Sequence, residues 1–72
     1  MADGTYIIDL AFGTWQNRIW LCDKEEADSA DRRWTDAKQS LEEVGEHCAN
    51  SNEFFNEAVK HFEKFGFVRI QR

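Results

Sequence analysis

The chain has 72 residues, of which 14 are acidic and 9 are basic, so its formal net charge at pH 7 is −5. A chain of this length forms one small globular domain, residues 1–72, and buries only about 60% of the surface that its unfolded form exposes. We therefore expect no large active-site cleft. The excess of acidic side chains disfavours general phosphate binding and favours a basic partner.

Cysteine usage and hydropathy indicate the compartment. The two cysteines do not suggest a disulfide scaffold, and no apolar run approaches the roughly 18 residues that span a bilayer. The first residues, Met-Ala-Asp-Gly, lack the basic and apolar regions of a signal peptide. We expect a cytoplasmic protein with reduced thiols and no membrane contact, whose small core depends on three Trp, one Tyr and six Phe.

The first predicted element is a strand over residues 5–12. Its side chains alternate between two faces. The face that we expect to meet the core carries Tyr6, Ile8, Leu10 and Phe12. Residues 13–17 then contain Gly and Asn, which favour a turn, so the strand should form one arm of a hairpin.

Residues 18–22 predict the second arm of the hairpin, with two alternative registers. Either Ile19 and Leu21 or Trp20 and Cys22 face the core. The aliphatic pair matches the first strand better, and this choice leaves Trp20 on the outer face. The alternative, in which Trp20 belongs to the core, stays open.

A long helix is predicted between Lys24 and Asn50. Its apolar residues recur at alternating spacings of three and four, as one face of a helix requires. They are Ala27, Ala30, Trp34, Ala37, Leu41, Val44 and Cys48. The helix starts either at Lys24 or near Ala30, because Asp28 and Ser29 are both competent N-caps.

A second helix should begin at Asn50, which with Glu53 resembles a capping box. Its apolar stripe consists of Phe54, Phe55, Ala58, Val59, Phe62 and Phe65. Gly66 is suited to end this helix, and residues 67–71 return to the alternation of a short strand.

These elements predict an α+β fold in the order ββααβ. A three-stranded antiparallel sheet with one long and one shorter helix packed on one face satisfies every apolar stripe in two layers. We find no internal repeat, linker or proline.

No residue set predicts catalysis, a cofactor or a metal. Cys22, His47, Cys48 and His61 are a zinc set by type, but they lack the close ligand pairs of structural zinc sites. Cys48 lies on the apolar seam, where a free cysteine behaves as a small hydrophobe. We therefore expect a non-enzymatic protein.

The back of the long helix predicts a surface that we call the acidic ridge. Its carboxylates are Glu25, Asp28, Asp36, Glu42, Glu43 and Glu46. Over roughly 30 Å of helix, spaced carboxylates can imitate a nucleic-acid phosphate track and occupy a basic groove on another protein. The alternative is an ordinary solvated helix face.

The sheet face that turns away from the helices is predicted to be a second contact surface. It would carry Ile7, Asp9, Arg18, Trp20, Phe67 and Arg69. Aromatic and Arg side chains of this kind are typical of interface hot spots, so a partner protein or a second copy should cover them. The same combination can stack single-stranded nucleic acid, but the net charge argues against that use.

Small size, acidity, aromatic density and the lack of a catalytic set resemble, as a class, the compact inhibitors of phages and other mobile elements, including anti-CRISPR and nuclease-inhibitor proteins. The resemblance is one of composition and assigns no residues. It implies an inhibitor or regulator that occludes a basic surface of a larger partner. The alternatives are a self-associating homodimeric domain and a single-strand nucleic-acid binder.

Overall fold

A two-residue turn at residues 13–14 joins the first two strands, β1 (Thr5–Phe12) and β2 (Trp15–Asp23). The computed structural model describes residues 5–70. Gly13 has a φ of +64°, as the first central position of a type II′ hairpin turn requires. Because this turn needs only two residues, β2 begins at Trp15 and not at the predicted residue 18.

The register of the hairpin confirms the predicted faces of both strands. The antiparallel pairing runs without a bulge from Thr5 opposite Cys22 to Phe12 opposite Trp15. Directly opposed residues share a face. Ile19 and Leu21 are fully buried against the helices, so Trp20 lies on the outer face.

Helix α1 (Ala30–Glu46) begins at the later of the two predicted starts. Ala27 therefore lies in the preceding loop, and Cys48 lies beyond the end of the helix. Helix α2 (Ser51–Lys64) has the predicted cap, because the Asn50 side chain accepts a hydrogen bond from the Glu53 amide at 2.8 Å. The Glu53 carboxylate in turn accepts one from the Ala49 amide at 2.8 Å.

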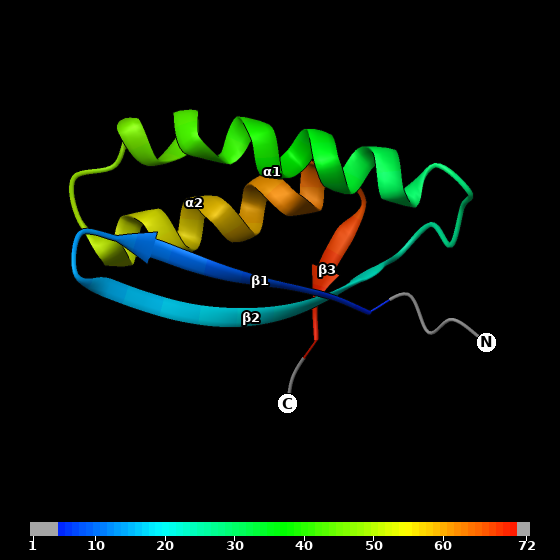
Figure 1. Cartoon of the computed structure of the whole chain (residues 1–72), viewed down its shortest axis with the longest axis horizontal. Coiled ribbons are helices and arrows are strands. Elements are labelled where there is room, and N and C mark those ends of the chain that lie inside the picture. The colour runs from blue at the N-terminus through cyan, green and yellow to red at the C-terminus, as the bar shows by residue number, and fades with distance from the viewer. Residues whose placement is uncertain (1–4, 71–72) are drawn as a thin grey trace.

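The third strand, β3 (Phe67–Arg69), pairs antiparallel with the end of β2. The sheet order is β1-β2-β3, so β2 is central and β1 is an edge. Both helices lie on the same side of the hairpin (Figure 1). α2 lies against the sheet, and α1 lies next to α2. The predicted α+β fold with the order ββααβ is confirmed.

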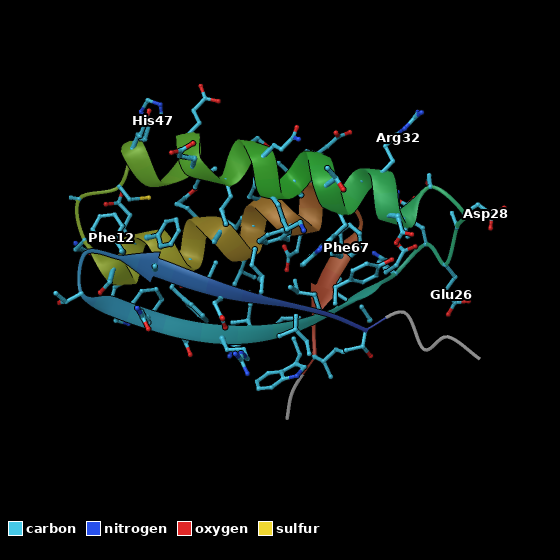
Figure 2. All side chains as sticks on the ribbon, viewed as in Figure 1. Phe12, Glu26, Asp28, Arg32, His47 and Phe67 are labelled. Carbon is cyan, nitrogen blue, oxygen red and sulfur yellow. The ribbon has the colours of Figure 1, made fainter. Side chains whose placement is uncertain are left out.

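Aromatic rings fill the space between the sheet and the helices. At one end, the Trp34 ring centroid lies 4.9 Å from that of Tyr6 and 5.1 Å from those of Phe62 and Phe67. At the other end, Phe12 packs on Phe54 at 5.5 Å. Figure 2 shows Phe12 and Phe67 pointing into this interior from opposite ends of the molecule.

One buried ion pair joins the sheet to α1. The Asp23 side chain is almost fully buried, and Arg33 donates to it from Nη2 to Oδ2 at 2.8 Å. Asp23 also accepts the amides of Glu25 and Ala27 at 3.0 and 3.1 Å, which shapes the loop before α1. The hydrogen bond from Arg33 holds the pKa of Asp23 below its ordinary value of 3.8, although burial acts in the opposite direction.

Arg33 also reaches the end of α2. Its Nη1 atom donates to the Phe65 carbonyl at 2.6 Å, and its guanidinium lies 5.2 Å from the centroid of the Phe67 ring. Gly66 follows with a φ of +91°, and a Cβ atom there would lie 2.6 Å from Arg33 Nη1. The chain therefore needs a glycine at this point for its backbone conformation and for its close approach to Arg33.

We predict that Asp23→Asn destabilises the fold by about 3 kcal/mol, because it leaves the Arg33 charge without its buried partner. Asp9→Asn is the matched control, since the Asp9–Arg18 pair is exposed and should contribute little. Urea unfolding at pH 7 measures both. Equal losses in the two variants would contradict a special role for Asp23.

The same pair predicts an acid dependence. Because the pKa of Asp23 is lower when folded, its stabilisation is present above the unfolded value near 3.8 and is lost as pH falls through the folded value. Wild type should therefore lose more stability between pH 6 and pH 3 than Asp23→Asn does. Parallel pH profiles of the two proteins would rule this out.

We also predict that Gly66→Ala costs more stability than Gly13→Ala. Both residues have a positive φ, but a Cβ atom at Gly13 meets nothing within 4 Å, whereas one at Gly66 meets Arg33. Gly13→Ala should cost about 1 kcal/mol and Gly66→Ala clearly more. Thermal unfolding of the two variants gives the comparison, and equal losses would mean that Arg33 moves aside without cost.

Candidate protein-binding surfaces

A groove of about 430 Å³ runs between β1 and the second half of α1. One wall is the β1 backbone with the turn that follows it, and the floor includes Leu41 and Phe54. Glu42 and Glu46 line the opposite wall, together with Lys38. The groove therefore combines an apolar floor, a strand backbone and an excess of carboxylates, and we call it the β1 groove.

A hydrogen bond joins β1 to α1 beyond the β1 groove. The Tyr6 hydroxyl donates to the Asp31 carboxylate at 2.9 Å. Burial and this hydrogen bond to a carboxylate raise the pKa of Tyr6. Tyr6 thus stays protonated as a donor.

The backbone of β1 is unpaired along the groove side. In a two-residue hairpin, residues whose backbone groups bond to the partner strand alternate with residues whose backbone groups point away from it, in the plane of the sheet. The Trp20 carbonyl accepts the Ile70 amide at 2.8 Å, so the backbone of Trp20 faces β3. Its cross-strand partner Ile7 therefore faces the free edge, as do Asp9 and Ala11. Within residues 5–70, no backbone hydrogen bond from another element occupies this edge.

The structure divides the predicted acidic ridge into three parts. Glu25 and Asp28 belong to the loop before α1, and Glu25 lies 3.9 Å from Arg33. Glu42 and Glu46 line the β1 groove. Asp36 and Glu43 do not line the groove, and at about 100° per residue they lie next to Glu46 on the outward side of α1. The later helix start therefore removes two of the six acids from the predicted ridge, and the other four remain on the outward side of α1.

The last two turns of α1 are unusually acidic. Glu42, Glu43 and Glu46 are exposed, and this end of the helix has no basic residue in its last turn. Within residues 5–70, none of the three makes an ion pair. Carboxylates at a helix C-terminus oppose the helix dipole, so this arrangement costs stability and needs another explanation.

The outer face of the hairpin carries the predicted Ile7, Arg18 and Trp20. Ile7 is 53% exposed and stands opposite the half-buried Trp20. Arg18 donates to Asp9 at 2.7 Å, which neutralises both charges on this face. The hydrogen bond from Arg18 lowers the pKa of Asp9, so the pair stays ionised at neutral pH.

Two residues predicted for this outer face lie elsewhere. Phe67 is fully buried in the core, and the Arg69 guanidinium lies 4.9 Å from the Phe55 ring on the helix side. The cause is the register of β3, which places Phe67 opposite Asp23 and Val68 opposite Cys22. Val68 and Ile70 take the outer positions. The outer patch thus consists of Ile7, Trp20, Cys22, Val68 and Ile70.

The thiols and histidines do not form a cluster. Within residues 5–70, no three His, Cys, Asp or Glu side chains come together as metal ligands. Burial, Glu53 and Glu57 raise the pKa of the Cys48 thiol, and its sulfur donates to the Val44 carbonyl at 3.2 Å. A thiol held in its protonated form is a poor nucleophile.

The sequence prediction missed a contact between Ser40 and His61. Ser40 Oγ lies 3.0 Å from His61 Nε2, but the hydroxyl donates to the Asp36 carbonyl of its own helix at 2.8 Å. His61 Nε2 also lies 3.0 Å from the Ala37 carbonyl, an acceptor that requires the nitrogen to carry the proton. In this arrangement His61 cannot accept a proton from Ser40, and the contact clamps α2 to α1.

The β1 groove was also missed, because it depends on strand order. A constant alternation without proline or lysine over residues 5–12 was the one available signal for an unprotected strand edge. Whether that edge was free depended on β3, which could have paired with either strand of the hairpin.

Comparisons with protein-family models, with curated proteins and with solved structures found no match to this chain. Across residues 5–70, neither helix has the length and hydropathy of a membrane span.

Proposed function

We propose that this protein is a non-enzymatic inhibitor or regulator that binds a basic surface of a larger protein. The observation that supports this proposal most directly is the group of unpaired glutamates, Glu42, Glu43 and Glu46, at the C-terminal end of α1. They oppose the helix dipole and gain no ion pair within residues 5–70 in return. Basic side chains of a partner would supply the missing counter-charges.

The chemistry of the remaining side chains supports a binding role over a catalytic one. Cys48 is held as a thiol, and Ser40 donates its hydroxyl proton to a helix carbonyl. A net charge of −5 would also speed encounter with a basic partner. The compact inhibitors of phages and mobile elements, anti-CRISPR proteins among them, share this size and charge. A basic surface that normally holds nucleic acid is accordingly the target class that we propose.

We predict that charge reversal at Glu42, Glu43 and Glu46 to Lys abolishes partner capture. Immobilised wild-type protein should retain its partner from a lysate of the organism that encodes it, and quantitative mass spectrometry should show at least a tenfold loss with the variant, about 1.4 kcal/mol. Capture should also weaken as salt is raised, because the contact is electrostatic.

A charge-matched variant controls for the change in net charge. Glu26, Glu57 and Glu63 are exposed and lie away from the β1 groove, so their joint reversal to Lys changes the net charge equally. This control should still capture the partner. Equal loss of capture in both variants would mean that only the overall charge matters. Full capture by the variant with Lys at positions 42, 43 and 46 would refute the proposal.

Self-association is a second candidate, supported by the outer patch. Ile7 is the exposed large hydrophobic residue of the described chain, and the Asp9–Arg18 pair leaves this face without net charge. Two copies related by a two-fold axis could therefore bring their patches together without charge repulsion.

We predict that a dimer formed in this way is broken by Ile7→Lys. Light scattering after size exclusion should show wild type as a dimer and the variant as a monomer. Gln16→Lys is the control, because Gln16 is exposed on the same face but lies outside the outer patch. A wild-type protein that stays monomeric at all concentrations would refute self-association.

A further inference from the structure

We propose that the β1 edge binds an extended basic segment of the partner as a fourth strand of the sheet. This inference rests on the proposed function and names the form of the partner. The β1 groove supplies the two requirements of strand addition, which are free backbone groups along an edge and space beside it for side chains.

The edge itself is the first argument. Natural sheets protect exposed edges with lysine, proline, bulges or very short strands. β1 has eight residues, no proline, no lysine and an unbroken register with β2. Its single charge, Asp9, is already paired with Arg18. A long edge without lysine, proline or a bulge is suited to pair with another chain.

The walls of the groove determine which chain fits. A strand added beside β1 would turn every second side chain toward α1, where Leu41 forms part of the floor. Glu42, Glu46 and Lys38 form the wall, so carboxylates outnumber the one ammonium group there. Lys and Arg suit these positions, because their methylene groups cover apolar surface while their charges reach the carboxylates. The other side chains would continue the outer face beside Ile7, so apolar residues suit them.

A second copy of this chain fits the edge less well. Its own β1 would bring Asp9 and no basic residue to a groove that already contains Glu42 and Glu46. Like charges across an interface oppose association. Charge complementarity therefore favours a basic segment of another protein.

The backbone test uses Ala11, whose amide faces the free edge and whose side chain lies on the outer face. Ala11→Pro removes this amide donor without removing a hydrogen bond to β2. Ala11→Thr is the control, because it enlarges the side chain and keeps the backbone amide. The probe is a fluorescein-labelled peptide of alternating Lys and Val with eight residues, the length of β1. Fluorescence anisotropy measures its binding.

We predict that wild type and Ala11→Thr bind this peptide, and that Ala11→Pro binds it about tenfold more weakly. A peptide of alternating Glu and Val should not bind. Circular dichroism checks that Ala11→Pro is folded. If it is not, two peptides methylated on the two alternate sets of backbone nitrogens make the same test on wild-type protein, since each blocks pairing through one edge of the peptide strand.

The charge test compares the two acids of α1 that line the β1 groove with two that do not. Glu42→Gln with Glu46→Gln should weaken peptide binding about tenfold, whereas Asp36→Asn with Glu43→Gln should leave it nearly unchanged. Both double variants remove the same charge. Equal weakening by the two would mean that the peptide responds only to overall charge, which would overturn the inference.

The remaining outcomes separate this inference from the proposed function. Unchanged binding to Ala11→Pro and to the methylated peptides, or no binding of the basic peptide to wild type, would overturn strand addition. The capture experiment with the lysine variants would then still decide the inhibitor proposal. A wild-type dimer that Ala11→Pro converts to monomer would assign the edge to a second copy and would likewise overturn the inference.

Discussion

The ion pair between Asp23 and Arg33 is the interaction that joins β2, α1, the end of α2 and β3. Asp23 ends the central strand and fixes the loop before α1 through two backbone amides. Arg33 lies in the second turn of α1 and reaches the carbonyl of Phe65 just beyond α2. Two charges removed from water are expensive unless their hydrogen-bonding capacity is satisfied. Here the carboxylate and the guanidinium both have several partners, and the pair fixes where α1 begins relative to the sheet.

Local patterns predicted most of this fold because they are set by neighbouring residues. Alternation predicted β1 to its exact ends, and the Asn50 cap depends on a residue only three positions away. The start of α1 stayed open, since it is decided by Asp23, whose acceptor role no periodicity reveals. β3 was placed on the wrong face because both of its sides are partly apolar. The Arg69 side chain lies on the helix side of the sheet because its guanidinium packs over the Phe55 ring.

The predicted binding residues show a similar limit. Spacing along a helix assigned six carboxylates to one surface, but the later helix start leaves two of them in a loop, and the position of β1 places Glu42 and Glu46 beside a groove. Sequence could predict that these acids are exposed, and it could not predict which backbone lies beside them. The neutral outer face and the acidic β1 groove therefore meet at the β1 edge, where Asp9 belongs to both.

The position of β3 after both helices has a consequence for the order of folding. The hairpin closes over two residues, whereas β3 must return to β2 across both helices, which carries a larger loop-closure entropy. We expect the hairpin to form early and β3 to dock late, because local contacts form before distant ones. Docking of β3 buries Phe67 and brings the Phe65 carbonyl to Arg33 in the same step. The C-terminal end of the described chain thus completes the core and the ion-pair network together, which makes the last step of folding cooperative.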